Sequence, residues 1–337
     1  MLNSSREAVE HSVQMFMGSS GFVSLFINLF GLYLIIYNHG IIDDYRYYLL
    51  YFQTILLIFD VYFSIFMIPI PLFPIIGGYS IGVLSNVFEI STHHQMIFAL
   101  WCVGNTNTCI FISLLKRHQV VAAIEQKNTI APRILRFSKL SSNLLPLLGT
   151  IFYAFTEPDQ TQKVDIINQK YPGSNWLLQI PGIVIYDISY SLNPSFLFLT
   201  YGIMFGTLML FSAYCVLYAQ LYFMLGSMKS RISVRTYRKH VVAVISTIMQ
   251  NLVFLVFFIA PIFLLAIVIY SGSDASGRLS AVTSQMFSLP STCIIMVCVF
   301  SLHSSANTIV MSLTFPAFRQ TMFAIPHRIC RTHECPQ

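Results

Sequence analysis

Residues 196–225 read FLFLTYGIMFGTLMLFSAYCVLYAQLYFML and contain no Asp, Glu, Lys or Arg. A helix of this length spans about 45 Å at a rise of about 1.5 Å per residue, and the hydrocarbon core of a bilayer is about 30 Å thick. The apolar residues are continuous and do not alternate at every second position, which favours a helix over a strand of a membrane barrel. We therefore predict that this stretch crosses a membrane as an α-helix.

The composition of the whole chain agrees with this prediction. Charged residues make up 9% and hydrophobic residues 55% of the 337 residues, whereas a soluble domain carries about 25% charged residues. So few charges cannot cover the surface of a water-soluble protein of this size, and an aromatic content of 15% excludes a disordered chain. The net charge of +6 is expected to reflect basic cytoplasmic loops, so no nucleic-acid partner is predicted.

Seven apolar segments are candidate spans, and together they predict an all-α membrane protein built as a seven-helix bundle. They are residues 15–37, 48–70, 93–115, 140–155, 196–225, 241–270 and 287–311. The fourth is the weakest, because it is short and contains Pro146 and several polar residues. Its flanking loops support it: residues 116–139 and 227–240 are both basic and should share one side of the membrane, which requires an even number of crossings between them.

The distribution of basic residues also predicts the orientation. With the N-terminus outside, fifteen Lys and Arg residues lie on the cytoplasmic side and four outside. Residues 1–14 are then an extracellular N-terminus and residues 316–337 a cytoplasmic tail. Asn3, in an Asn-Ser-Ser sequon, becomes a candidate glycosylation site, and Cys330 and Cys335 become candidate palmitoylation sites. The first apolar stretch is too long for a typical cleavable signal peptide.

Asp60 is the only acidic residue well inside a predicted span. Ionisable groups at this depth are costly and are commonly functional. We expect Asp60 to form a buried switch or ion site together with Asn28, Asn105 and His303. A hydrogen-bonded structural carboxyl that only joins helices is an equally open interpretation.

Candidate ligand contacts come from the third and sixth spans. Trp101 and Asn105 lie one turn apart, and this face should point into the bundle because lipid cannot satisfy an amide; hydrogen bonding between helices explains the same pattern. Pro261 permits a kink in the sixth span beside Phe258, although a static kink fits as well. The expected contacts to a small, mostly apolar ligand are Trp101, Asn105, Phe258 and Tyr270.

A long outer loop, residues 156–193, separates the fourth and fifth spans. Loops of such length are commonly functional, and the β-favouring residues 183–186 suggest a partly ordered lid. Glu89, His93 and His94 lie at the outer end of the third span. Glu89 and His93 are four residues apart and could face a metal ion together, but the set is incomplete, so no metal or other cofactor is predicted. His93 and His94 remain candidate ligand contacts.

Basic residues flank the spans on the predicted cytoplasmic side. Arg117 directly follows the third span, and a second group precedes the sixth: Arg231, Arg235, Arg238 and Lys239. Such residues can anchor a protein to anionic membrane lipid, or they can bind an acidic protein partner.

Four motifs occur in order along the chain. They are YRYYLLYFQ at 45–53, PIPLFPI at 69–75, RHQ at 117–119 and HSSAN at 303–307. In these motifs the sequence resembles the nematode seven-helix chemoreceptors, serpentine receptor classes h and i of the larger Str group, and class i best.

The resemblance implies a G-protein-coupled receptor, located in the plasma membrane of sensory-neuron cilia, that detects small environmental molecules. It also implies that Arg117 contacts a heterotrimeric G protein, with Arg231, Arg235, Arg238 and Lys239 as further contacts. The neighbours of Arg117 are Lys116 and His118, in place of the Asp and Tyr of rhodopsin-like receptors. The outer loop also lacks the cysteine that usually bridges it to the third span.

Two other classes fit the sequence less well. A membrane transporter or ligand-gated channel needs a polar lumen and broken helices, and only Asp60 and residues 104–108 supply polar groups at depth. A membrane enzyme would need a catalytic constellation, and no such motif occurs in the sequence. We therefore expect no enzymatic activity and keep the transporter or channel as the alternative.

Overall fold

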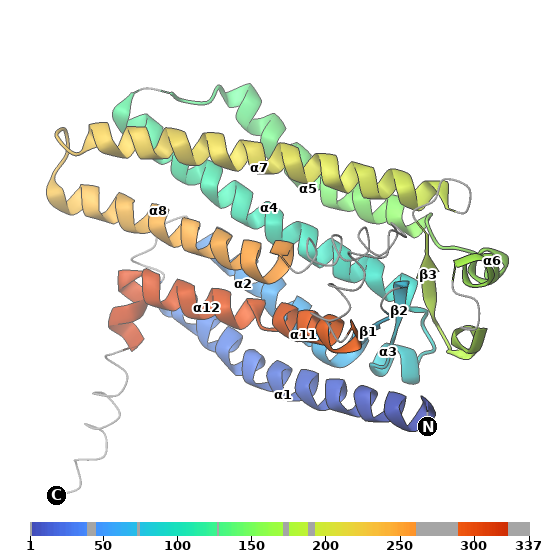
Figure 1. The fold of residues 1–337 in the computed structure, drawn as a ribbon. Coiled ribbons are helices and arrows are strands. Elements are labelled where there is room, and N and C mark those ends of the chain that lie inside the picture. Colours follow the sequence, from blue (N-terminus) through green and yellow to red (C-terminus); the bar gives the residue numbers. More distant parts are fainter. Residues whose placement is uncertain are drawn as a thin grey trace, which may run out of the picture.

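The computed structural model describes residues 2–38, 45–72, 75–126, 128–170, 175–187, 193–260 and 289–322. Long helices lie side by side in one bundle (Figure 1). One end of the bundle, here called the sheet end, carries strands β1 (Pro69–Pro71), β2 (Ile76–Ser80) and β3 (Val184–Tyr186). The opposite end, here called the basic end, carries residues 229–233 between α7 and α8 together with residues 315–322.

The bundle consists of α-helices, two of which continue as π-helical turns. They are α1 (Leu2–Tyr37), α2 (Tyr45–Val61) with η1 (Tyr62–Met67), α4 (Thr92–Glu125), α5 (Pro132–Ala154), α7 (Pro194–Met228), α8 (Val234–Phe254) with η3 (Leu255–Ile259), α11 (Leu289–Ser301) and α12 (His303–Thr314). Within the described ranges, six helices are long and apolar enough to cross a membrane. The fourth helix of the bundle, α5, is not among them, because basic and polar side chains fill its first half.

Local sequence signals set the starts of several helices. The Ser91 side chain accepts a hydrogen bond from the backbone of His94, and Asn193 does the same for Phe196. Ser233 caps α8 in the same way. Ser and Asn are favoured at this position because a helix leaves its first N–H groups without intrahelical partners. The caps therefore fix where α4, α7 and α8 begin.

Several helices extend beyond their predicted spans. α1 begins at Leu2, so the helix also includes most of the residues predicted to precede the first span. The residues before the apolar run contain neither Pro nor Gly, so nothing in them stops the helix. α4 and α5 likewise include residues 116–125 and 132–139, which lie toward the basic end.

Two other predicted spans differ in their interior or at their end. The second span stops before Pro69, and Ile70, predicted to be helical, lies in β1. Proline lacks an N–H and disfavours a helical conformation in the residue before it, which explains the stop. The predicted span 287–311 is interrupted at its centre, because α11 ends at Ser301 and α12 begins at His303.

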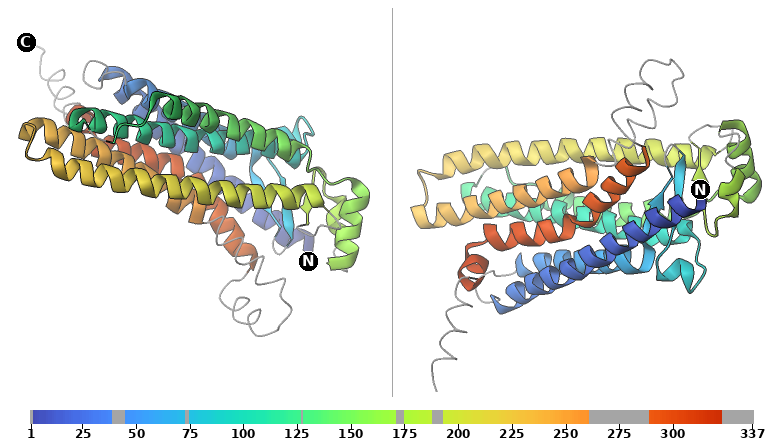
Figure 2. Two further views of the ribbon diagram at one scale, coloured as in Figure 1. Left: turned by 90° about the horizontal axis from the view of Figure 1, so that it is seen from above. Right: turned by 60° about the horizontal axis from the view of Figure 1, so that its bottom comes forward.

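α4 lies at the centre of the bundle. It packs against α2, α5, α7 and α8, and α1 packs against α2, α11 and α12 (Figure 2). The main apolar core includes Leu56 and Phe59 of α2, Cys102 and Leu114 of α4, and Phe258 of η3. α4 therefore connects most helices of the bundle through its packing contacts.

The sheet joins two loops that are far apart in the sequence. β2 pairs antiparallel with β1, with Ile70 opposite Tyr79, and with β3, with Gly77 opposite Ile185. A side chain at Gly77 would overlap the Val184 backbone, so glycine permits this close approach. β3, α6 (Gln160–Lys170) and the short 3-10 helix η2 (Asn175–Gln179) show that the predicted outer loop is partly ordered.

Candidate functional site

Asp60 lies in a buried polar network between three helices. Its carboxylate accepts hydrogen bonds from Ser24 of α1 and Ser304 of α12, and from the Asn28 Nδ2 at 2.9 Å. The Asn28 Nδ2 also lies 2.7 Å from the Ser304 Oγ. Asp60 is only 4% exposed, so the carboxylate depends on these donors in place of water. The network therefore ties α1, α2 and α12 together.

The network extends toward the basic end. The Gln53 Nε2 donates to the Asn28 Oδ1 at 2.8 Å and to the Thr308 Oγ1 at 2.7 Å. The Thr308 hydroxyl also donates to the Asn28 Oδ1 at 2.7 Å. Gln53, Asn28 and Thr308 are all buried. This second group joins the same three helices nearer the basic end.

The expected partners of Asp60 are only partly correct. Asn28 bonds to it, whereas Asn105 accepts from the Tyr51 hydroxyl at 3.2 Å and donates to the Trp101 carbonyl at 2.8 Å. His303 lies 3.0 Å from the Phe300 carbonyl through its Nδ1. The predictions of Asn105 and His303 as partners of Asp60 are therefore wrong.

Two partners of Asp60, Ser24 and Ser304, were not predicted. A serine in an apolar helix commonly bonds to its own backbone, so it carries little signal in the sequence. One signal was available: Ser24 and Asn28, and likewise Ser304 and Thr308, are four residues apart and share a helical face.

An aromatic cluster lies beside Asp60. Phe258, which is fully buried, has its ring centroid 4.2 Å from those of Phe300 and His303 and 4.9 Å from that of Phe254. Phe59, the residue before Asp60, lies 6.0 Å from Phe258. The cluster therefore packs η3, α11 and α12 against α2 at the level of the polar network.

The predicted ligand contacts lie against different helices. The Trp101 ring stacks on Phe98 at 5.7 Å, and Asn105 faces Tyr51 of α2. Thr108, on the same face of α4, donates to the Ser142 carbonyl of α5 at 2.6 Å. This face of α4 therefore packs against α2 and α5, while Phe258 packs against α11 and α12.

Other candidates lie beyond what the structure describes. Pro261 and Tyr270 of the sixth span, and Cys330 and Cys335 of the tail, are outside the described residues. Asn3 belongs to the first turn of α1, and its side chain is also outside them. Their predicted roles stay predictions.

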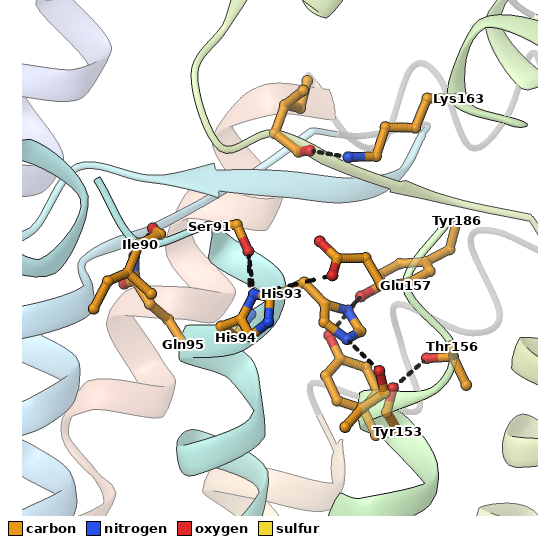
Figure 3. Close-up of polar contacts among 12 residues, drawn as sticks. Ile90, Ser91, His93, His94, Gln95, Tyr153, Thr156, Glu157, Lys163 and Tyr186 are labelled. Atoms are coloured by element: carbon orange, nitrogen blue, oxygen red, sulfur yellow. Dashed lines mark hydrogen bonds and ion pairs between the residues drawn. The ribbon is translucent and has the colours of Figure 1, made fainter. Parts of the chain in front are cut away.

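Four residues form a cluster at the sheet end, here called the aromatic clasp: His93, Tyr153, Tyr186 and Phe196. The His93 Nδ1 lies 2.5 Å from the Tyr186 hydroxyl, which lies 2.6 Å from the Tyr153 hydroxyl (Figure 3). The His93 and Tyr153 rings stack at 4.6 Å, and those of Tyr186 and Phe196 at 4.4 Å. The aromatic clasp therefore joins α4, α5, β3 and α7 at one point.

Burial and the neighbouring Tyr153 raise the pKa of Tyr186 above its ordinary value of about 10. The Tyr186 phenol therefore stays protonated at physiological pH and can donate to the His93 Nδ1 while it accepts from Tyr153. His93 also approaches the Ala154 carbonyl through its Nε2 at 3.4 Å. In this arrangement every polar atom of the His93 ring has a partner.

Glu89, a candidate metal-binding partner of His93 in the sequence, does not share a helical face with it. Glu89 has a positive φ of 52° and lies before α4, which begins at Thr92. His94 instead lies 2.7 Å from the Ser91 Oγ and 4.0 Å from the Glu157 carboxylate. Among the described residues, no group of three His, Cys, Asp or Glu could hold a metal ion.

The predicted G-protein contacts all lie at the basic end. The Arg117 guanidinium carbon lies 3.6 Å from the centroid of the Tyr45 ring. Four other basic side chains are exposed near the α7–α8 connection: Arg231, Arg235, Arg238 and Lys239. His118 and Glu125 bond to Gln220 and Ser227 of α7, which holds the end of α4 in place.

A family model described as serpentine type 7TM GPCR chemoreceptor Sri matches residues 10–322 of the chain. The chain belongs to this family. The match agrees with the resemblance seen in the sequence motifs, and chemoreceptors of this kind are receptors rather than a class of enzyme. No curated protein matches the Sri chain in sequence.

The fold of the Sri chain is similar to that of squid rhodopsin. The two share 14% sequence identity with a TM-score of 0.58, over 98% of the Sri chain and 88% of the rhodopsin chain. At this identity the likeness shows the fold alone. It confirms the predicted seven-transmembrane, GPCR-like helix bundle.

Proposed function

We propose that the Sri chain is a plasma-membrane chemosensory receptor that binds a small molecule at the sheet end and signals to a heterotrimeric G protein at the basic end. One observation carries the proposal: the two groups of candidate residues lie at opposite ends of the bundle. His93 belongs to the aromatic clasp and His94 follows it, whereas Arg117 and the α7–α8 basic residues lie at the far end. In the proposed orientation the sheet end faces the outside of the cell and the basic end faces the cytoplasm, so the N-terminus is extracellular.

The Asp60 network is the proposed switch between the two ends. It lies in the interior of the bundle and joins α1, α2 and α12 through side-chain hydrogen bonds. Phe258 places η3 against the same region. A ligand shifts a receptor between two arrangements only by binding one of them more tightly. Contacts to Phe258 and Trp101 are the proposed route by which ligand binding favours one arrangement.

The ligand class and tissue follow from family kinship. We infer a small environmental molecule, sensory-neuron cilia and membership of the larger Str group, which includes class h. Expression with a promiscuous G protein, followed by a screen of volatile compounds and metabolites, tests the first inference. Ion current or solute uptake by vesicles that contain only this protein would instead favour the channel or transporter.

We predict that Arg117→Ala abolishes ligand-evoked signalling while the receptor still reaches the cell surface. The variant removes the cation proposed to contact the G protein, and within the described part of the chain the Arg117 Nε makes no hydrogen bond that the variant would lose. A second-messenger assay, normalised to surface expression, measures the effect. Lys116→Ala, which removes the adjacent cation, is the matched control and should signal normally. Full signalling by Arg117→Ala would contradict the proposed role.

A further inference from the structure

We propose that Tyr45 holds Arg117 in the resting receptor through a cation–π contact and so controls when Arg117 is available to the G protein. This inference rests on the proposed function, because it takes Arg117 as a G-protein contact. Its direct basis is the distance of 3.6 Å between the Arg117 guanidinium carbon and the centroid of the Tyr45 ring. Cation–π contacts are attractive when the cation lies within about 6 Å of the ring centroid.

The surroundings of Arg117 leave the ring as its main partner. Lys116 precedes it, and the next residue, His118, is directed to Gln220 of α7. No carboxylate within the described ranges forms an ion pair with Arg117, and its buried Nε has no hydrogen-bond partner. A guanidinium is planar and stacks on aromatic faces, so the Tyr45 ring can stabilise a cation that has no acidic partner among the described residues.

Tyr45 is itself fixed by the basic end of the bundle. It is only 6% exposed, and its ring stacks on that of Phe315 with 6.3 Å between centroids. Phe315 in turn lies 5.3 Å from Phe318. The Tyr45 hydroxyl is buried and has no hydrogen-bond partner among the described residues. The ring, and not the hydroxyl, therefore makes the contact with Arg117. Tyr45→Phe keeps the ring and should preserve this contact.

One helix connects this contact to the Asp60 network. α12 carries Ser304 and Thr308 in the network and ends at Thr314, directly before Phe315. A displacement of α12 that alters the hydrogen bonds of Asp60 would therefore also move Phe315 against Tyr45. Packed elements of this kind shift between discrete arrangements. In the active arrangement, Tyr45 no longer covers Arg117.

The first test measures ligand-independent signalling at equal surface expression. Tyr45→Leu removes the ring and is expected to raise basal signalling about fivefold. This factor corresponds to the interaction energy of a partly desolvated cation–π contact. Tyr45→Phe should match the wild type. The matched control is Tyr48→Leu, at a neighbouring, partly buried tyrosine, whereas the ring that lies over Arg117 is that of Tyr45. The combined change of Tyr45→Leu with Arg117→Ala should remove the basal signal, because Tyr45 acts through Arg117.

A second test keeps the shape of the core intact. Phenylalanines with one, two and three fluorine atoms, introduced at position 45 by stop-codon suppression, withdraw electron density from the ring face in steps. Basal signalling should rise with each fluorine atom. A flat response, or equal rises for Tyr45→Phe and Tyr45→Leu, would overturn the proposal.

Two acids beside Tyr45 in the sequence provide the rival explanation. Asp43 and Asp44 lie outside the described residues, and a carboxylate could hold an arginine by charge. Asp43→Asn and Asp44→Asn should leave basal signalling unchanged, and a rise equal to that of Tyr45→Leu would assign the restraint to an acid. These outcomes differ from a failure of the proposed function. If Arg117 did not contact the G protein, Arg117→Ala would still signal, whichever residue occupies position 45.

Discussion

At the scale of single residues, Asp60 shows how a carboxyl is accommodated inside a greasy bundle. Ser24, Asn28 and Ser304 supply hydrogen bonds from α1 and α12, so the buried group has donors from two neighbouring helices. Removing one member of such a network costs more than the bond itself, because the partners left behind stay desolvated. The network is therefore a site where small substitutions should have large effects.

We predict that Asp60→Leu lowers the free energy of unfolding by about 2 kcal/mol or more, because buried donors from Ser24, Asn28 and Ser304 lose their acceptor. Asp60→Asn keeps a carbonyl oxygen in place and should be milder. Thermal unfolding of the receptor in detergent measures both. Ile58→Leu, at an exposed position of the same helix, is the control and should unfold like the wild type. An unchanged Asp60→Leu would show that the network contributes no stability.

The sequence alone identified residues whose charge is unusual in or beside an apolar segment. It did not identify residues whose role depends on their neighbours in the folded chain. Asp60 stands out because charges are rare in apolar segments, and Arg117 stands out because it lies in a basic segment directly after the third predicted span. Ser24 and Ser304 do not, since many serines lie in these helices. Tyr45 lies far from Arg117 in the sequence, so only the folded bundle shows their contact.

At the scale of elements, the aromatic clasp links the outer loop to the helices at the sheet end of the bundle. β3 reaches the helices through Tyr186, which contacts side chains from α4, α5 and α7. The Thr92 backbone N–H also donates to the Gly182 carbonyl at 3.2 Å. The predicted lid is thus fastened to α4 at its first turn.

We predict that Tyr186→Phe speeds amide hydrogen exchange in β3 by about tenfold or more. The hydroxyl serves both His93 and Tyr153, which are buried, so its loss leaves both without that partner. A cost of about 1–3 kcal/mol per unsatisfied group corresponds to that change in local opening. Hydrogen exchange with mass spectrometry measures it, and Tyr201→Phe at an exposed site of α7 is the control. Equal exchange in both variants would argue against the clasp.

Helix boundaries followed the sequence where a cap or a proline marks them. Pro69 ends the second helix, and Ser233 starts α8. The sheet was less accessible, because pairing of Gly77 with Ile185 joins segments far apart in the chain. Only the β-favouring residues 183–186 gave a local sign of it.

At the scale of the whole molecule, the two ends of the bundle differ in chemistry. The sheet end is closed by strands and aromatic rings, while exposed Arg and Lys side chains lie at the basic end. Basic residues gather on the cytoplasmic side of membrane proteins, so this asymmetry favours the proposed orientation. The same asymmetry was readable in the sequence, because it depends on composition and spacing alone.

We predict that Asn3 carries a glycan when the receptor is expressed in animal cells. The residue lies at the sheet end, which faces the lumen during synthesis if the N-terminus is extracellular. Glycosidase treatment should reduce the apparent mass of the wild type and leave Asn3→Gln unchanged. An antibody against residues 231–239 that stained intact cells would contradict the orientation.

The fastening of the outer loop has a practical consequence. The loop at 156–193 contains no cysteine. The aromatic clasp joins it to α4 through the hydrogen bond between Tyr186 and His93, and to α7 through the stacked rings of Tyr186 and Phe196. A cystine in that place would tie the fold to an oxidising compartment. Thiol reagents such as dithiothreitol should therefore leave the loop attached, so the receptor can be extracted and purified under reducing conditions.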